Sequence, residues 1–302
     1  MTLDTLPLGQ YVKGAVFGIA AVSIWAGWIV VTRLGVTTGL SVWDIAAMRL
    51  VTAGLILTPV LMKKGLAYDR LGWKGLMAIA IGGGALMVAF VAAGTTFAPA
   101  AHGGALFPGV MPVFVALLAT AILGEPFPIP KKLGLVGISA GVVVIVGPGI
   151  FSVDQQTVGH MLFLSAALIW AGYTVAMRFG RLDGLHAAAI AAVASMLIYL
   201  PVYALFLEDG LFDNPMPVLA FQAFYQGILT MIISFYFYGN AVRILGASNG
   251  AAFGALGPVI VALLAIPILG EFPSLTDWLG ISFIAGGVYL ASGAPLPGST
   301  FS

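Results

Sequence analysis

Charged residues interrupt this chain so rarely that they mark out its apolar stretches. Asp, Glu, Lys and Arg are absent from residues 14–32, 50–62, 75–124, 133–153, 155–177, 184–207, 214–242, 244–270 and 278–302. A helix that crosses a bilayer needs about 20 mostly apolar residues. The stretch 75–124 is long enough for two such helices, which a turn at Phe-Ala-Pro-Ala (residues 97–100) would separate. The pattern therefore predicts ten membrane-spanning helices, at residues 12–34, 42–62, 74–95, 99–122, 131–148, 159–180, 186–207, 217–240, 246–268 and 275–292.

Composition identifies the class of protein. Of 302 residues, 61% are apolar and 8% are charged, whereas a soluble domain has about 25% charged residues. The fold class is therefore an all-α membrane protein, with no room for a soluble catalytic domain. The net charge of +1 gives no electrostatic footprint for nucleic acid. The absence of Cys excludes disulfides and thiolate metal sites, and we expect neither a metal nor a cofactor.

Basic residues predict the orientation, because cytoplasmic loops carry the excess of Lys and Arg. If the N-terminus is cytoplasmic, the predicted helices leave most basic residues on the cytoplasmic side and Asp and Glu mainly on the other. These basic residues are Lys13, Lys63, Lys64, Arg70, Lys74, Lys131, Lys132, Arg178, Arg181 and Arg243. We therefore expect a multi-pass protein of the bacterial inner (plasma) membrane with both termini in the cytoplasm.

Two blocks of sequence occur twice. Ile-Trp-Ala-Gly at residues 24–27 recurs at 169–172, and the eleven residues 115–125 recur at 261–271 with two substitutions. The offsets of 145 and 146 residues agree closely, so a chance match of short apolar words is a poor explanation. The chain is predicted to contain two copies of a five-helix unit.

An odd number of helices in each unit inverts the second copy in the membrane. We predict one repeat in residues 1–150 and an inverted repeat in residues 151–302, with Glu125 on the cytoplasmic side and its counterpart Glu271 on the other. Inverted repeats are typical of secondary transporters, whose two halves expose a shared site alternately to the two sides.

Several short motifs resemble the EamA-type drug/metabolite transporter superfamily, and the resemblance extends over about residues 12–292. The motifs are Trp-Ala-Gly at 25–27 and 170–172, Ala-Ala-Met-Arg at 46–49, and Leu-Gly-Glu at 123–125 and 269–271. The resemblance implies a ten-helix transporter with a central cavity. It also implies a relationship to bacterial exporters of amino acids and related metabolites.

Two aromatic pairs lie at repeat-related positions near the middle of their helices. They are Trp25 with Trp28, and Trp170 with Tyr173. Membrane Trp and Tyr usually gather at the interfaces, so these rings are candidates for gripping a substrate. Helix packing or contact with lipid is the alternative for each.

The predicted helix at 217–240 carries a polar and aromatic face. Spacings of three, four and seven residues bring together Gln222, Tyr225, Gln226, Leu229 and Tyr236. A primary amide in mid-membrane is costly unless it is bonded. Tyr225 and Gln226 are therefore candidates for substrate binding, with an interhelical hydrogen bond as the alternative for Gln226.

Prolines inside the predicted helices at 99–122 and 246–268 suggest bends. Pro108, Pro112 and Pro258 each remove a backbone donor, so we expect bends there that could serve gating. Ser248 and Asn249 lie before the second bend and could bind a polar head group.

His102 is the one side chain titrating near neutral pH that we place within the cavity. It is therefore a candidate for substrate binding and for proton coupling, against the alternative of a hydrogen-bonded residue at the outer rim. His160 and His186 lie near helix ends, and the three histidines fall on three different predicted helices. No metal cluster is expected from them.

Arg49 is placed about two turns into its helix, where a charge is expensive. We expect it to snorkel to the interface or to bond backbone carbonyls there, with binding of a substrate carboxylate as the alternative. Asp44 is a poor partner because a spacing of five residues points it about 140 degrees around the helix.

Gly134, Gly137 and Gly141 form a small-residue face. Such a face packs closely against another helix, either within the bundle or in a homodimer.

These observations predict a secondary active exporter of small metabolites, working by alternating access. The leading substrates are amino acids with apolar or aromatic side chains, and the partners are the substrate and the lipid bilayer. Exporters of other metabolites or drugs, or a passive channel, are the alternatives. A membrane-embedded enzyme is disfavoured because the sequence contains no metal-ligand cluster or paired nucleophile and base.

Overall fold

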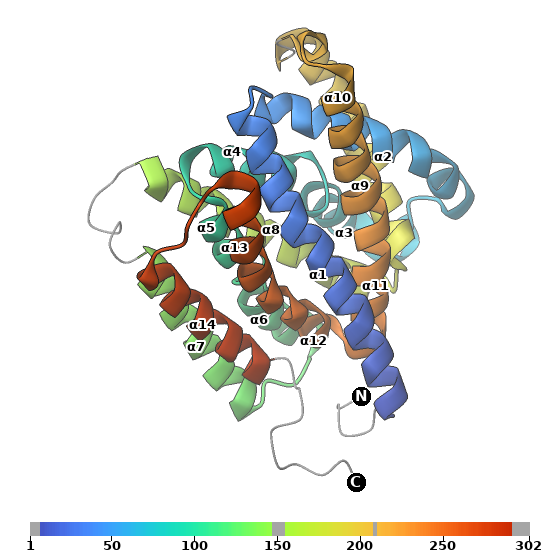
Figure 1. Cartoon of the computed structure of the whole chain (residues 1–302). Coiled ribbons are helices and arrows are strands. Elements are labelled where there is room, and N and C mark those ends of the chain that lie inside the picture. Colours follow the sequence, from blue (N-terminus) through green and yellow to red (C-terminus); the bar gives the residue numbers. More distant parts are fainter. Residues whose placement is uncertain (1–6, 147–154, 208–209, 292–302) are drawn as a thin grey trace.

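The computed structural model describes residues 7–146, 155–207 and 210–291, and in these ranges every regular element is a helix (Figure 1). The predicted boundary between the two repeats, at residues 150 and 151, lies outside the described residues. The helices form one bundle around a shared core.

The described part before that boundary contains seven α-helices. They are α1 (Leu8–Thr37), α2 (Val42–Lys64), α3 (Tyr68–Gly82), α4 (Ala85–Phe97), α5 (Ala100–Leu106), α6 (Met111–Leu123) and α7 (Ile129–Val146).

The described part after it contains seven more α-helices, together with π and 3₁₀ turns. They are α8 (Gln155–Phe179), α9 (Gly184–Val202), the π turn η3 (Tyr203–Leu207), the 3₁₀ turn η4 (Leu211–Asp213), α10 (Met216–Ala223), the π-helix η5 (Phe224–Ile233), α11 (Ser234–Leu245), α12 (Ala247–Ala252), the 3₁₀ turn η6 (Phe253–Ala255), α13 (Leu256–Leu269) and α14 (Leu275–Ala291).

Eight helical segments in the described residues are long and apolar enough to cross a membrane. This makes the chain a multi-pass membrane protein. The remaining two predicted spans correspond to α7 and α14, of 18 and 17 residues. The ten-span inverted repeat and the side of each terminus stay predictions.

One predicted helix, at residues 74–95, is interrupted. The helical conformation is interrupted at Gly83 and Gly84, between α3 and α4, because consecutive glycines are poor helix formers. Ser195 of α9 occupies the break, since its hydroxyl accepts from the Ala85 N–H at 3.2 Å and donates to the Ala80 carbonyl at 3.1 Å. The side chain thus satisfies backbone groups that the interrupted helix leaves open.

The small-residue face of α7 packs against α14 inside the bundle, and Figure 1 shows these two helices lying side by side. A Cβ atom built on Gly141 would lie 2.5 Å from the Gly280 carbonyl oxygen, and one on Gly137 would lie 3.0 Å from the Cα of Gly287. Close packing within the chain is therefore confirmed for this face. The homodimer stays a prediction.

This packing predicts the effect of a larger side chain. Gly141→Leu should destabilise the protein by at least about 2 kcal/mol, because α7 and α14 would have to move apart. The control is Gly286→Leu, since nothing lies within 4 Å of a Cβ at Gly286. Thermal melting in detergent should show a lower midpoint for the first variant alone. Equal melting of the two variants would mean that the helices do not meet at Gly141.

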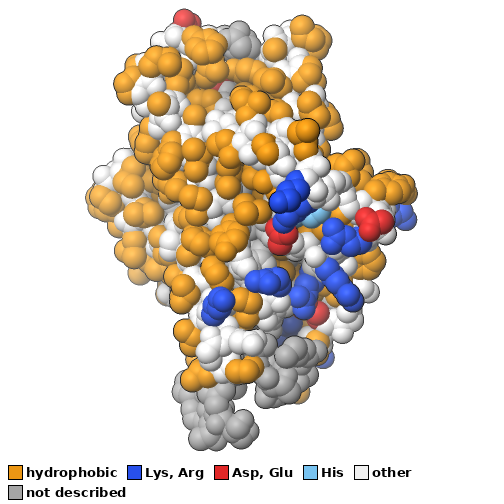
Figure 2. All heavy atoms as spheres, turned by 90° about the vertical axis from the view of Figure 1, so that its right-hand side faces the viewer, with side chains coloured by type: hydrophobic (Ala, Val, Ile, Leu, Met, Phe, Trp, Pro, Cys, Tyr) orange, Lys and Arg blue, Asp and Glu red, His pale blue; other side chains and the backbone are white. Residues whose placement is uncertain are grey.

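Basic side chains gather in one region of the face shown in Figure 2, while apolar side chains cover most of the rest. The last turns of α2, α8 and α11 carry Lys63, Lys64, Arg178 and Arg243, and we call the end of the bundle where these helices finish the basic end. The other end, where α1 finishes and α2 begins, is the opposite end.

An ion pair ties two helices together at the basic end. The Lys64 ammonium lies 2.5 Å from the Asp183 carboxylate, at the start of α9. Burial raises the pKa of Asp183, but hydrogen bonds from Lys64 and from the His186 backbone N–H outweigh it and hold the pKa below its usual value. Both side chains are partly exposed, so the pair contributes little to stability.

Candidate functional site

A cluster of seven aromatic side chains fills the middle of the bundle. Trp25 of α1 meets Trp170 of α8 edge to face, with ring centroids 5.1 Å apart, so the two repeat-related tryptophans are in direct contact. Each ring of the cluster is at most 3% exposed. We call these residues the aromatic cluster: Trp25, Trp28, Phe107, Trp170, Tyr173, Phe235 and Tyr238.

Trp170 lies at the centre of this cluster. Besides Trp25, its ring centroid lies 4.8 Å from Tyr173, 4.9 Å from Phe235, 5.6 Å from Tyr238 and 6.4 Å from Phe107. In this conformation the rings therefore pack on one another. A substrate between Trp25 and Trp170 would require them to separate.

Hydroxyl groups fix the orientation of two of the rings. The Trp25 indole donates to the Ser234 hydroxyl at 2.7 Å, and the Thr174 and Tyr238 hydroxyls lie 2.8 Å apart. These bonds join α11 to α1 and to α8. They supply the partner that a buried indole or phenol requires.

The π-helix η5 changes which residues of this segment face the cluster. Sequence periodicity predicts that Tyr236 shares a face with Gln226, but Tyr236 is 41% exposed and Tyr238 is 1% exposed. A π-helix has more residues per turn than an α-helix, so it rotates the face of α11 that follows it. The prediction for Tyr236 was wrong for this reason.

Gln226 and Tyr225 attach η5 to α1. The Gln226 amide nitrogen donates to the Thr32 hydroxyl at 3.0 Å and to the Gln222 side-chain oxygen at 3.1 Å. The Tyr225 hydroxyl donates to the Ile24 carbonyl at 3.4 Å. Interhelical bonding of Gln226 is thus confirmed, and its buried Oε1 atom has no hydrogen-bond partner.

Arg49 lies deep inside the bundle. Its side chain is 0% exposed, and none of its three guanidinium nitrogens has a hydrogen-bond partner. The guanidinium carbon lies 4.6 Å from the centroid of the Trp28 ring and 5.9 Å from that of Phe235. The expectation that Arg49 snorkels or bonds carbonyls was wrong, because its side chain is buried against the rings of Trp28 and Phe235.

His102 belongs to a chain of three titratable groups. Its Nδ1 atom lies 2.9 Å from His160 Nε2, and its Nε2 atom lies 2.9 Å from the Asp277 carboxylate. The three residues come from α5, α8 and α14. Hydrogen bonding of His102 is confirmed, while proton coupling and substrate binding stay predictions.

Glu125 caps a helix N-terminus at the basic end of the bundle. Its carboxylate accepts from the backbone N–H groups of Ala247 at 3.0 Å and Ser248 at 3.2 Å, and from the Ser248 hydroxyl at 2.6 Å. The carboxylate thereby caps the N-terminus of α12. Ser248 is engaged in this cap, and the Asn249 amide donates to the Leu245 carbonyl at 3.0 Å; substrate binding by the two stays a prediction.

Glu271 makes the reciprocal contact at the opposite end. Its carboxylate accepts from the Ala100 backbone N–H, at the start of α5, at 2.8 Å and pairs with Arg33 at 2.8 Å. Glu125 and Glu271 are equivalent in the repeat, as are the starts of α5 and α12. Each carboxylate therefore caps a helix in the part of the chain that carries the other carboxylate, and both caps are formed in this structure.

The prolines at the predicted bends lie where one helix ends and the next begins. α5 ends at Leu106 and α6 begins at Met111, with Pro108 in the gap and Pro112 in the first turn of α6. Pro258 lies in the first turn of α13, directly after the 3₁₀ turn η6. A bend at Pro108 is confirmed, and gating by these prolines stays a prediction.

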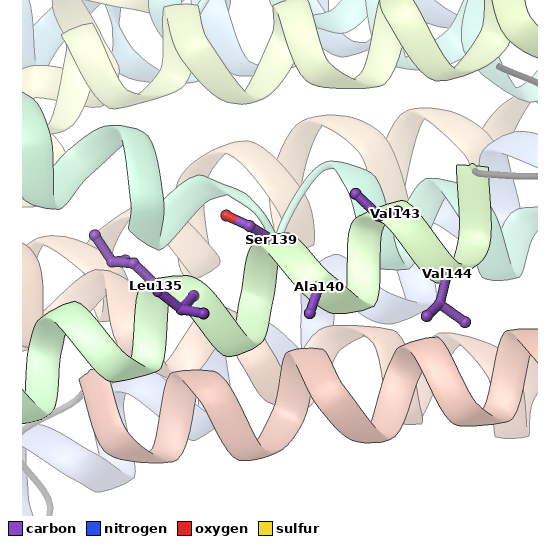
Figure 3. A pocket seen from close by; sticks show the side chains of 6 residues that line it. Leu135, Ser139, Ala140, Val143 and Val144 are labelled. Atoms are coloured by element: carbon purple, nitrogen blue, oxygen red, sulfur yellow. The ribbon is translucent and has the colours of Figure 1, made fainter.

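An open hollow of about 600 Å³ lies along α7 (Figure 3). Its lining consists of Leu135, Val136, Ser139, Ala140, Val143 and Val144. No charged residue lines it, and Val136 and Val143 are largely exposed. An apolar outer helix face of this kind suits contact with lipid, so we place the candidate site at the aromatic cluster instead.

The geometry thus combines a buried aromatic centre with reciprocal caps at the two ends. A family model described as the EamA-like transporter family matches residues 12–147 and residues 157–293. The chain belongs to this family. Membership of the drug/metabolite transporter superfamily, expected from the short motifs, is confirmed.

Two relatives named as transporters agree with this assignment. The chain is 28% identical to the "Probable terminal-alkyne amino-acid exporter" of Streptantibioticus cattleyicolor, over 90% of this chain and 91% of the relative. It is 26% identical to the "Uncharacterized inner membrane transporter YedA" of Escherichia coli K12, over 92% and 90%. Family and names point to transport rather than to catalysis.

A solved structure titled "Crystal structure of protein" has the same fold. It superposes with a TM-score of 0.67 at 19% identity and covers 92% of this chain and 97% of that chain. At this identity the likeness concerns the fold alone.

Sequence reasoning missed four residues of the centre: Phe107, Ser234, Phe235 and Tyr238. Phe107 precedes Pro108 at the predicted bend, and that position was the available signal. The other three follow the π-helix, whose altered periodicity leaves no clear signal in the sequence.

Proposed function

We propose that this EamA-like protein is a secondary active transporter that exports small metabolites, most of all amino acids with apolar or aromatic side chains. The observation that carries the proposal is the contact between Trp25 and Trp170, which are equivalent residues of two repeated segments. A site on a pseudo-twofold axis requires such a pair. The name of the Streptantibioticus relative, an amino-acid exporter, supports the amino-acid class.

Transport would proceed by alternating access between two inverted halves, residues 1–150 and 151–302. The two segments that match the family model support this division. The two reciprocal caps supply a reason for alternation: opening one end breaks the cap at Glu125, and opening the other end breaks the cap at Glu271.

The substrate would lie between the parted rings. Trp25, Trp28, Trp170, Tyr173 and Tyr225 would contact its apolar part, because all five line or adjoin the centre. Its polar end would meet Gln226 at the centre, and it would meet His102 toward the opposite end and Ser248 and Asn249 toward the basic end as the molecule enters or leaves. The basic residues that gather at one end of the bundle support a cytoplasmic location for that end. Both termini would then lie on the cytoplasmic side of the bacterial inner membrane.

Counterflow in proteoliposomes tests the proposed function. Saturable exchange of an amino acid supports a carrier for that class. Flux that neither saturates nor exchanges would favour a passive channel, and saturable exchange of other solutes alone would favour a different metabolite or a drug.

His102 would couple export to protons, and a variant tests this. His102→Gln should abolish the response of transport to a pH gradient, because the imidazole between His160 and Asp277 could no longer take up and release a proton. The control is His186→Gln, whose imidazole contacts the Gly65 carbonyl at the basic end. An unchanged gradient response in His102→Gln would remove His102 from coupling.

A further inference from the structure

Arg49 carries a buried charge that the described chain leaves unbonded. A guanidinium has five N–H donors and stays protonated in proteins, and all three nitrogens of Arg49 lack a hydrogen-bond partner. Breaking a buried pair by removing one partner is strongly destabilising, because an uncompensated charge remains. The site is therefore built for an anionic partner.

Four described carboxylates at helix ends are engaged elsewhere. No described carboxylate pairs with Arg49. Their partners are Ser41 and Tyr203 for Asp44, the start of α12 for Glu125, Arg33 and the start of α5 for Glu271, and His102 with Ser274 for Asp277. The partner of Arg49 must therefore come from outside this set.

One further unbonded polar atom adjoins Arg49, and a second belongs to a residue that bonds α1 one turn away. The indole of Trp28, over which the guanidinium lies at 4.6 Å, has a buried Nε1 without a partner. Gln226 bonds Thr32, one turn after Trp28 on α1, and its Oε1 is also without a partner. Stacking on an indole offsets only part of the cost of a desolvated cation.

We propose that Arg49 binds the carboxylate of the transported molecule. Trp28 Nε1 donates to the same carboxylate, and Gln226 Oε1 accepts from the ammonium group of an amino acid. The inference rests on the proposed function for the fact of transport, and it narrows the substrates to molecules that bear a carboxylate. Amines and esters that lack the anion are excluded as good ligands.

Ligand-induced thermal stabilisation of the full-length protein in detergent tests the binding site without requiring transport. The probes are phenylalanine, leucine and 3-phenylpropionate, each compared with the corresponding amide. The carboxylates should raise the melting temperature in a saturable manner, and the amides should not. Equal stabilisation by the amides, or none by any carboxylate, would overturn the proposal.

Variants then assign the effect to Arg49. Arg49→Gln should weaken carboxylate binding by about 30-fold or more, because a desolvated charge pair loses one member. Arg49→Lys keeps the charge without the bidentate geometry and should bind with intermediate affinity. Arg49→Met replaces the buried charge with an apolar chain and guards against misfolding of the Gln variant. Arg243→Gln is the matched control, since Arg243 is exposed and bonds Asn240.

The outcomes separate the two proposals. Carboxylate-dependent stabilisation that disappears in Arg49→Gln and Arg49→Met, in a protein that exchanges no amino acid, would keep the site and reject amino-acid transport. Amino-acid exchange that remains saturable with unchanged affinity in folded Arg49→Met would keep the transporter and reject the site.

Discussion

Replacing Trp170 with alanine is expected to reduce transport of phenylalanine by about 30-fold or more, since truncation of a buried aromatic anchor costs about 2 kcal/mol or more in binding. Trp170 contacts five other rings of the aromatic cluster, including Trp25. Its loss would remove one wall of the site. Exchange in proteoliposomes, normalised to folded protein, measures the effect.

A second variant of the same helix separates binding from stability. Trp170→Ala also leaves a core cavity that costs about 3–5 kcal/mol. Phe163 of α8 is equally buried but packs on Gly94 and Gly103 outside the aromatic cluster. Phe163→Ala should therefore lower stability comparably while the folded fraction still transports. Equal transport losses in the two variants would mean that Trp170 acts through stability alone.

Removing either cap carboxylate is expected to open the protein to one side only. Glu125→Ala leaves the first N–H groups of α12 uncapped, and Glu271→Ala does the same to α5. Loss of a helix cap costs about 1–2 kcal/mol, which shifts the ratio of the two open states by about 5- to 30-fold. The two variants should shift that ratio in opposite directions.

A single cysteine reports the direction of opening, because the natural chain contains none. Thr174→Cys places a thiol beside Tyr238 in the centre. An impermeant thiol reagent should label it faster from the basic end in Glu125→Ala and faster from the opposite end in Glu271→Ala. Faster labelling from the same side in both variants would contradict reciprocal closure. Glu125→Gln, which keeps one acceptor oxygen, should shift labelling less.

The helices were readable from sequence because charges are confined to their ends. The predicted span at 42–62 is found at Val42–Lys64, and the turn predicted at 97–100 separates α4 from α5. The contact between Trp25 and Trp170 could also be anticipated, because internal repetition relates the two residues. Local pattern and symmetry were sufficient for these features.

Other features depend on contacts between distant parts of the chain, which the periodicity of apolar residues does not reveal. The break at Gly84 is held by Ser195, which lies 111 residues further along the chain. The π-helix η5 rotates Tyr238 inward and Tyr236 outward. Arg49 was expected at the interface, since a lone charge is costly inside a membrane. Its burial against Trp28 depends on how α1 and α2 meet.

Counterflow in proteoliposomes tests the proposed transport most directly. Vesicles are loaded with unlabelled amino acids, and the entry of labelled phenylalanine, threonine and a cationic dye is followed. We expect saturable accumulation of phenylalanine driven by exchange, weaker exchange of threonine, and none of the dye. Failure of all three from folded, inserted protein would contradict an amino-acid carrier, although the fold and family would stand.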